Sequence, residues 1–296
     1  MSFSDLEFYL KLIEYFFRSN LNKLFIIFST FLFSPKLFFL EVRRRLFGKN
    51  YEFLGVNISS NAAFDFLYYF YVVKNTGYEI RKYKNGYFLI DKKLNLKIFS
   101  DNFFDIISLL PENSLDLHEY KLDKKEIKCK KILDIGGYID TPIAFSKMGA
   151  RKVITYELIY YRVLLKNLKL NRMKNVIVKP HYIYSSECKK LEEFLKGLKE
   201  WSKNKKLKKL KRKTFSWKEV LKENFDIAKV DCEGCEEGLL YVDNKLLQKI
   251  PIWLIEIHGN DLRRKIIEKF RSAGFKEKLV HVHNQKAFIY RFFLTS

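Results

Sequence analysis

The C-terminal part of the chain alternates apolar runs of strand character with segments of helical periodicity. Residues 130–137, 152–157 and 175–183 form the apolar runs, and residues 160–171 repeat their apolar side chains at helical spacing. Consecutive parallel strands need a long crossover connection, which is usually a helix. The alternation therefore predicts βαβ units, and it restricts residues 119–296 to an α/β fold with a mostly parallel sheet.

The turn after the first predicted strand carries two glycines. Gly136 and Gly137 follow Asp134, and the second predicted strand ends in Glu157, 23 residues after Asp134. Glycines at this point let the backbone approach a ligand, and an acidic residue about 20 residues further on binds the hydroxyl groups of a ribose. The alternative is a tight turn without a ligand and a solvated strand end. The order of strand, glycine turn, helix, strand and acid favours a nucleoside-binding site.

The residues after the glycines distinguish between two classes of cofactor. A dinucleotide site needs a third glycine beside the pyrophosphate, and this chain has Tyr138 and Asp140 in that part of the turn. A carboxylate repels pyrophosphate but is acceptable beside the cationic sulfonium and amino group of S-adenosylmethionine, so methyl transfer fits better than hydride transfer. The next helix is expected to begin with Thr141 as its N-cap and Pro142 at the first position, and to close at Gly149.

Four segments carry the motifs of a known family. They are LDIGGYIDTPIAF (133–145), VITYE (153–157), KVDCEGCE (229–236) and LIEIHG (254–259). Together they resemble the FkbM family of S-adenosylmethionine-dependent methyltransferases, most of which are O-methyltransferases, over about residues 120–275. The resemblance implies a Rossmann-like class I methyltransferase sheet, mostly parallel with an antiparallel last strand, and S-adenosylmethionine as the cofactor. A predicted hairpin around Asn284 agrees with that order of elements.

The resemblance also implies roles for individual residues. The cofactor would be bound by Asp134, Gly136, Gly137, Tyr138 and Glu157, and the acceptor pocket would contain Asp231, Glu233, Glu256 and His258. Methylating a hydroxyl group requires a base near the departing proton, so Asp231, Glu233 and His258 are the candidate catalytic residues. The implied acceptor is a hydroxyl-bearing small molecule or glycan, such as a saccharide or a glycolipid. The alternative is structural, with Glu233 and Glu236 capping the next helix.

The glycine turn is one residue shorter than the family pattern. The family usually has Asp-x-Gly-Ala-Asn/Tyr-x-Gly-Asp-Thr, whereas residues 134–141 read DIGGYIDT, as though the second loop glycine were deleted. A shorter loop predicts a narrower cofactor cleft. A second hypothesis is therefore a catalytically inactive methyltransferase-fold protein, which acts as a binding or scaffold protein through a basic insertion and N-terminal helices.

Four cysteines are too few for a disulfide framework in 296 residues. Since no small-x-small cleavage site is visible, we expect a reducing, cytoplasmic environment, with peripheral membrane contact as an addition. Cys232-x-x-Cys235 is compatible with a redox pair or half of a zinc site, but no second Cys/His pair stands at ligand spacing. His281-x-His283 fits one face of a strand better, so we expect no metal.

Three regions are expected along the chain. Residues 1–74 form a helical, aromatic-rich extension, residues 75–118 form a small antiparallel β unit with a hairpin at Asn85-Gly86, and residues 119–296 form the methyltransferase domain. The apolar run 24–40 is shorter than the roughly 20 residues that span a bilayer, and Pro35 interrupts it. It therefore predicts two helical pieces, either packed on the protein or lying at a membrane interface. Residues 64–73 predict another buried helix.

The formal net charge of +22 requires an anionic partner or a strongly solvated surface. Residues 189–213 hold 12 Lys and Arg against three Glu, which is +9, and their apolar residues recur at helical spacing. This basic insertion and the N-terminal helices predict contact with an anionic membrane surface. Nucleic acid is the less favoured partner, because residues 231–234 read DCEG where methyltransferases of base amino groups have Asn/Asp-Pro-Pro-Tyr.

Overall fold

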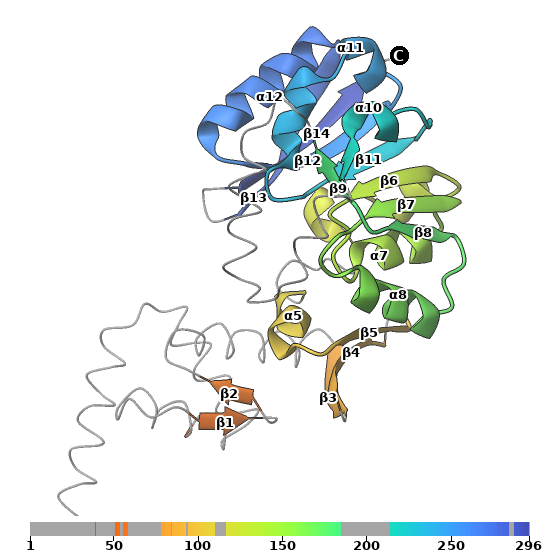
Figure 1. Cartoon of the computed structure of the whole chain (residues 1–296), viewed down its shortest axis with the longest axis vertical. Coiled ribbons are helices and arrows are strands. Elements are labelled where there is room, and N and C mark those ends of the chain that lie inside the picture. The colour runs from red at the N-terminus through yellow and green to blue at the C-terminus, as the bar shows by residue number, and fades with distance from the viewer. Residues whose placement is uncertain are drawn as a thin grey trace, which may run out of the picture. The chain divides into compact units, whose positions relative to one another are not determined.

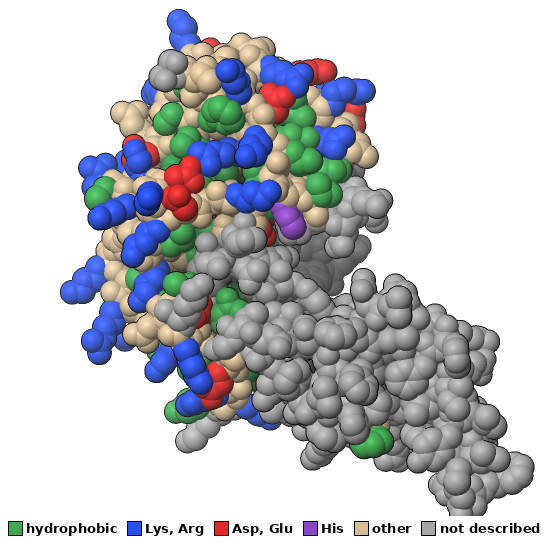
Figure 2. Space-filling model, turned by 180° about the vertical axis from the view of Figure 1, so that it is seen from behind, with side chains coloured by type: hydrophobic (Ala, Val, Ile, Leu, Met, Phe, Trp, Pro, Cys, Tyr) green, Lys and Arg blue, Asp and Glu red, His purple; other side chains and the backbone are tan. Residues whose placement is uncertain are grey.

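The computed structural model divides the chain into two compact units, Met1–Pro111 and Glu112–Ser296. It describes residues 39, 51–53, 56–58, 78–83, 85–92, 94–109, 117–184, 214–283 and 287–295 (Figure 1). On the face drawn in Figure 2, Lys and Arg side chains are spread over the described surface and Asp and Glu side chains are few. The positive charge of the chain is therefore a property of this surface as well as of the basic insertion.

The C-terminal unit is built on a seven-stranded sheet in its described part. The strands are β6 (Lys131–Ile135), β7 (Lys152–Tyr156), β8 (Val176–Lys179), β11 (Ile227–Val230), β12 (Ile252–His258), β13 (Phe275–His283) and β14 (Ala287–Leu294). Their order is β13-β14-β12-β11-β6-β7-β8, and β14 runs antiparallel to both of its neighbours while the other pairs are parallel. This confirms the predicted Rossmann-like class I methyltransferase sheet.

Helices cover both faces of this sheet. They are α6 (Lys124–Ile127), α7 (Thr141–Lys147), α8 (Tyr161–Leu170), α10 (Trp217–Val220), α11 (Asn244–Leu247), α12 (Asn260–Ser272) and the 3-10 segments η2 (His118–Tyr120) and η4 (Cys235–Tyr241). Consecutive strand residues contribute to opposite faces: Leu254 packs with Phe145 of α7, whereas Trp253 and Ile255 pack with Phe270 of α12. The result is a sheet buried on both sides, as expected for parallel strands.

The start of α7 differs from the prediction. Asp140, and not Thr141, is the N-cap residue, and its side chain makes no capping bond. The Thr141 hydroxyl instead donates to the carbonyl oxygen of Gly137 at 3.0 Å and approaches Asp134 at 3.3 Å. The end of the helix agrees with the prediction, because Gly149 follows the C-cap residue with φ at +99°.

The third predicted strand, residues 175–183, is divided in two. Strand β8 ends at Lys179, and Pro180 follows, which has no N–H group to continue the ladder. The chain then forms β9 (Tyr182–Tyr184), which pairs in parallel with β10 (Thr214–Ser216) outside the main sheet. Residues 185–213, which include the basic insertion at 189–213, lie outside the described residues.

The N-terminal unit contains a three-stranded antiparallel sheet. Strands β3 (Tyr78–Tyr83), β4 (Gly86–Asp91) and β5 (Leu96–Ser100) pair in sequence order, and helix α5 (Phe103–Ser108) follows. The pairing of Tyr83 with Gly86 confirms the predicted hairpin.

A second, two-stranded sheet lies within the segment 1–74, for which only helices were predicted. It is formed by β1 (Tyr51–Phe53) and β2 (Val56–Ile58). The helices expected at residues 24–40 and 64–73 lie outside the described residues, apart from the single position Phe39. None of the helices that the structure describes is long and apolar enough to cross a bilayer.

Candidate functional site

Four neighbouring strands bring the predicted site residues to one edge of the sheet. Glu157 follows β7, Gly136 follows β6, Asp231 follows β11 and His258 ends β12, and these strands are adjacent in that order. The first three of these residues come directly after the carboxyl ends of parallel strands, where ligands of open α/β sheets bind. The strand ends therefore place residues from widely separated parts of the chain side by side.

The glycine turn packs tightly against the end of β11. Gly136 has a φ of +75°, and a Cβ atom built on it would lie 1.6 Å from the backbone carbonyl oxygen of Asp231. A Cβ atom on Gly137 would lie 2.1 Å from the hydroxyl oxygen of Thr155. Both distances are far below van der Waals contact. The two glycines are therefore required for the internal packing of this turn, whatever ligand it binds.

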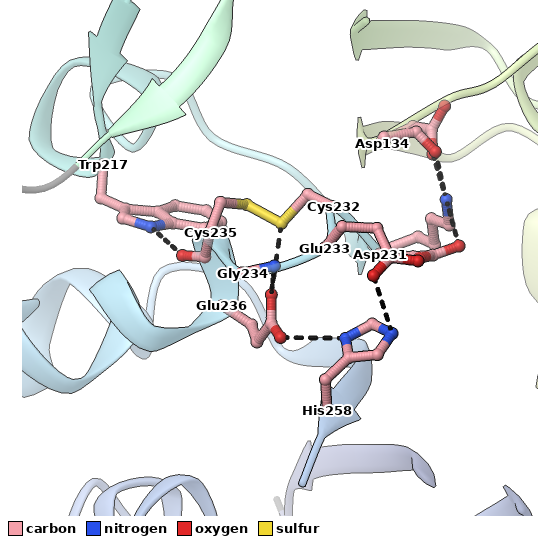
Figure 3. The surroundings of a disulfide bond; sticks show 11 residues. Asp134, Trp217, Asp231, Cys232, Glu233, Gly234, Cys235, Glu236 and His258 are labelled. Atoms are coloured by element: carbon pink, nitrogen blue, oxygen red, sulfur yellow. Dashed lines mark hydrogen bonds and ion pairs between the residues drawn. A yellow bond between two sulfur atoms is a disulfide. The ribbon is translucent and has the colours of Figure 1, made fainter. Parts of the chain in front are cut away.

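A buried lysine joins the glycine turn to two carboxylates. Lys229 lies on β11 and is 0 % exposed, and its Nζ donates to the carbonyl oxygen of Gly136 at 2.6 Å. The same nitrogen lies 3.5 Å from Oδ1 of Asp134 and 3.4 Å from Oδ2 of Asp231 (Figure 3). Burial alone would lower the pKa of Lys229, but the charges of Asp231 and Asp134 raise it well above its usual range. Lys229 is therefore a permanent cation at the centre of the site.

Asp134 is fully buried and holds the turn from within. Its Oδ2 accepts a hydrogen bond from the Thr155 hydroxyl at 2.8 Å, in addition to the contacts with Thr141 and Lys229. Burial raises the pKa of Asp134, and the charge of Lys229 and the Thr155 hydroxyl oppose that rise. These contacts direct the Asp134 carboxylate into the protein, so Asp134 positions the turn and does not reach solvent.

Asp231 is the acidic residue of this group that reaches solvent. Its side chain is 29 % exposed, and its Oδ2 accepts a 3.4 Å hydrogen bond from the hydroxyl of Tyr120. Tyr120 lies on η2, 111 residues earlier in the sequence. Burial, and then the charge of Asp231, raise the pKa of Tyr120 well above its usual range, so the phenol remains a donor. Tyr120 is not predictable as a site residue from the sequence, because no local motif marks it.

Glu157 accepts three backbone hydrogen bonds. Its Oε1 accepts from the amides of Ile159 and Tyr160 at 2.7 and 2.8 Å, and its Oε2 accepts from the amide of Tyr138 at 3.0 Å. Burial raises the pKa of Glu157, and these three amides oppose the rise. Tyr138 adopts a φ of +47°, and its ring packs edge-on against Tyr160 at 4.6 Å. The backbone of the glycine turn thus contacts the predicted ribose-binding carboxylate directly.

Three carboxylates surround His258. Its Nδ1 lies 3.0 Å from Oε1 of Glu236, and its Nε2 lies 3.5 Å from Oε2 of Glu233 (Figure 3). The same Nε2 lies 3.7 Å from Oε1 of Glu256. Burial alone would lower the pKa of His258, but the hydrogen bond and charge of Glu236, followed by the charges of Glu233 and Glu256, raise it to about 9. His258 is therefore an imidazolium at neutral pH, and in that state it donates protons and does not accept them.

Glu236, for which the sequence suggests only a helix-capping role, is the buried partner in this cluster. It is 0 % exposed, and its Oε2 accepts a hydrogen bond from the amide of Gly234 at 2.7 Å. Glu236 lies in the first turn of the 3-10 segment η4, and the amide that it binds belongs to the N-cap residue, Gly234. By contrast, the side chain of Glu233 is 72 % exposed. Glu233 can therefore contact a ligand, whereas Glu236 orients His258.

A disulfide closes the turn between these acids. Cys232 and Cys235 are joined, and both are buried (Figure 3). Of the two options left open by their spacing, the structure shows the oxidised pair. Cys129 is exposed and is not in a disulfide. The described part of the chain contains no group of three or more His, Cys, Asp or Glu side chains arranged to hold a metal ion.

The titration of His258 tests this arrangement. We expect a pKa of about 9 for His258, and a lower value in the Glu236→Gln variant, which loses the nearest negative charge. Because the folded-state pKa lies above the ordinary value of about 6.5, this interaction stabilises the fold fully below about pH 6.5 and is lost as the pH rises through about 9. NMR titration of the imidazole measures both values. Glu268→Gln on α12 is the control, and a wild-type pKa near 6.5 would contradict the arrangement.

Comparisons with known proteins give structural similarity only. Neither a protein-family model nor a curated protein sequence matches the chain. Similar solved structures include precorrin-6y C5,15-methyltransferase from Geobacter metallireducens, with 13% identity, 61% of this chain and 86% of that chain covered, and a TM-score of 0.37. Ribosomal protein L11 methylase from Lactobacillus delbrueckii subsp. bulgaricus has 12% identity, coverages of 61% and 78%, and a TM-score of 0.39.

An rRNA methylase from Streptococcus thermophilus has 11% identity, with 60% of this chain and 95% of that chain covered and a TM-score of 0.38. Identity and TM-score are low for all three structures. The fold class therefore rests on the order of strands in the sheet itself. The FkbM resemblance stays a prediction.

Proposed function

We propose that the chain is an S-adenosylmethionine-dependent methyltransferase that acts on a hydroxyl group of a saccharide or glycolipid-like acceptor. The observation that carries the proposal is the meeting of the glycine turn, Glu157 and Asp231 at the carboxyl edge of a sheet with class I strand order. S-adenosylmethionine, when bound, supplies a methyl group attached to a cationic sulfonium. The several carboxylates at the carboxyl edge of the sheet would stabilise the positive charge of the sulfonium.

The donors and acceptors of this edge fit the cofactor. A carboxylate has about four acceptor positions, and Glu157 uses three of them on backbone amides. The remaining position, on Oε2, can accept one ribose hydroxyl. Gly136 and Gly137 make the neighbouring turn a stretch of bare backbone, whose Cβ directions are filled by protein atoms. Glu157 would therefore bind the ribose through one hydrogen bond, and the turn would bind the methionine side of the cofactor.

Asp231 is the residue we assign as the general base. It follows β11, its backbone touches the glycine turn, and its side chain reaches solvent. As the acceptor oxygen forms its bond to the methyl carbon and the bond from carbon to sulfur breaks, the hydroxyl proton would pass to the Asp231 carboxylate. Protonated His258 cannot take this role at neutral pH. We assign His258 and Glu233 to hydrogen bonds that orient the acceptor.

A cavity beside His258 supports a polar acceptor. It has a volume of about 300 Å³ and is lined by Glu237, His258, Gly259, Asn260, Asp261, Leu262 and Lys265. Most of these side chains donate or accept hydrogen bonds, and several hydroxyl groups of a sugar can pair with them. The volume is at the lower end of the range for small-molecule sites. We therefore propose that a sugar-like part of the acceptor occupies it.

Calorimetric titration with S-adenosylmethionine tests the cofactor. We expect wild type to bind, and Glu157→Gln to bind about tenfold more weakly because the side chain loses its charge while it keeps one oxygen acceptor. Glu268→Gln on α12 removes the same charge far from the turn and should leave the affinity unchanged. Thermal unfolding of each variant shows whether the fold is retained. Equal affinity of wild type and Glu157→Gln for S-adenosylmethionine would show that Glu157 does not bind the ribose.

One observation favours the second candidate, a binding or scaffold protein without catalysis. The Tyr138 amide already donates a hydrogen bond to Oε2 of Glu157, which leaves one fewer acceptor position for a ribose hydroxyl. Absence of S-adenosylmethionine binding by folded wild type would establish this candidate over the methyltransferase. If the cofactor binds, loss of methyl transfer in Asp231→Asn with retained binding would support the assigned base.

A further inference from the structure

A second cavity lies at the opposite edge of the sheet. It has a volume of about 380 Å³ and is lined by Lys131, Arg151, Lys152, Lys174, Asn175 and Ile177. Lys131 and Lys152 are the first residues of β6 and β7, and Asn175 directly precedes β8. The cavity is therefore formed at the amino ends of the strands. A strand of five residues at about 3.3 Å per residue separates it from the glycine turn by roughly 16 Å.

The sequence places like charges on neighbouring strands at this edge. Lys131 and Lys152 are direct partners in the register of β6 and β7, and like charges at such positions destabilise a sheet. Glu223 neutralises Lys131 through a 2.9 Å contact. Lys152 has no such partner among the described residues. An anion in the cavity would supply a countercharge for Lys152.

Three cations of the cavity are available to a ligand. Arg151, Lys152 and Lys174 form no ion pair with any carboxylate in the ranges that the structure describes. The nearby acids Glu223 and Asp226 form ion pairs with Lys131 and Lys130, respectively. The cavity therefore concentrates three positive charges without a countercharge.

The walls of the cavity are held by hydrogen bonds. The side-chain amide of Asn175 donates to the carbonyl oxygen of Ala150 at 2.7 Å, and its oxygen accepts from the hydroxyl of Ser146. The backbone amide of Val153 donates to the carbonyl oxygen of Asn175 at 2.9 Å. These bonds tie the start of β8 to the turn before β7. Because the frame is fixed in advance, little ordering of the backbone opposes binding.

We propose that this cavity binds the phosphate groups of a phosphorylated ligand. A diphosphate carries about three negative charges, which matches the three available cations. Arg151 offers planar paired donors and the lysines offer compact charges, and both suit phosphate oxygens. The 42 % exposed side chain of Ile177 adds an apolar contact for the organic part. The proposal does not depend on methyl transfer, because none of these residues belongs to the carboxyl edge.

Calorimetric titration of the full chain with pyrophosphate at low ionic strength tests the site. The triple variant Arg151→Gln, Lys152→Gln, Lys174→Gln should bind at least about tenfold more weakly than wild type. The control Lys245→Gln, Lys249→Gln, Lys276→Gln loses the same charge at exposed positions elsewhere and should stay within about twofold. Equal loss in both variants would show a general charge effect and would overturn the proposal.

A second arm identifies the source of the phosphate. Co-sedimentation of the wild type and of the cavity variant is measured with vesicles of phosphatidylcholine alone and with vesicles that also contain phosphatidic acid. Pyrophosphate binding without vesicle binding indicates a soluble ligand, and binding to the anionic vesicles that only the cavity variant loses indicates a lipid headgroup. If neither pyrophosphate nor the anionic vesicles distinguish the cavity variant from its control, the proposal is wrong. Titration with S-adenosylmethionine in the cavity variant separates this outcome from failure of the proposed function.

Discussion

Replacement of Lys229 by methionine is expected to lower the free energy of unfolding by about 3–5 kcal/mol. Methionine fills a similar volume but leaves the carboxylates of Asp134 and Asp231 without their shared cation. Asp134 is 0 % exposed, so water cannot replace the lost charge. Urea unfolding at neutral pH measures the loss. The glycine turn also loses its hydrogen bond from Nζ to Gly136, so binding at the carboxyl edge should weaken with it.

The pH dependence of this variant identifies the cause. Burial already raises the pKa of Asp134, and removal of Lys229 raises it further above its unfolded value. The protonated acid is then favoured in the fold, so the stability deficit is small near pH 4 and grows as the pH rises toward 7. Lys131→Met is the control, because its ion pair with Glu223 is partly solvated and should be worth about 1 kcal/mol or less. Equal, pH-independent losses would contradict the buried-cation role.

Replacement of Gly136 by alanine is expected to destabilise the fold by about 3–5 kcal/mol. The added Cβ would lie 1.6 Å from the carbonyl oxygen of Asp231, and both groups belong to backbone that neighbouring strands hold in place. The φ of +75° adds the strain of a left-handed conformation. The turn must therefore move away from β11. Urea unfolding measures the destabilisation, and S-adenosylmethionine titration should show weakened binding.

Gly274→Ala is the matched control for this prediction. Gly274 has a similar φ of +85°, but the described atom nearest to its Cβ position, Nε2 of Gln248, is 3.9 Å away. Only the conformational strain of about 1–2 kcal/mol should appear there. The difference between the two variants measures the steric contact with Asp231. Similar losses at both positions would show that the close approach of the turn to β11 contributes nothing.

The sheet could be predicted from the sequence because its signals are local. The apolar runs that form β6, β7 and β12 are buried on both faces of the sheet. Burial on both faces requires consecutive apolar residues, and such runs are visible in the sequence. The N-cap residue of α7 was predicted wrongly, because the choice between Asp140 and Thr141 depends on contacts that form only in the folded turn. Thr141 has the side chain of a good N-cap, but its hydroxyl is used by Asp134 and Gly137 within the folded turn.

Only the site residues that end a strand or directly follow one could be predicted from the sequence. Glu157 and Asp231 follow their strands as expected, but Lys229 lies inside an apolar strand, where a sequence pattern gives no partner for its charge. Glu236 accepts a hydrogen bond from the N-cap amide of η4, as a helix-capping residue would, but it also contacts His258, 22 residues away. Such pairings follow from the register of the sheet, and a single sequence does not contain them.

The Lys229 contact also determines when this site can form during protein synthesis. Gly136 is made 93 residues before Lys229, which corresponds to roughly 5–20 s on a translating ribosome. Until then, the nascent strand–turn–helix segment holds Asp134 without its cation, so exclusion of that acid from water is unfavourable. A nascent chain that stops before β11 would thus expose its glycine turn to chaperones and proteases. Completion of the C-terminal half converts that vulnerable segment into a protected one.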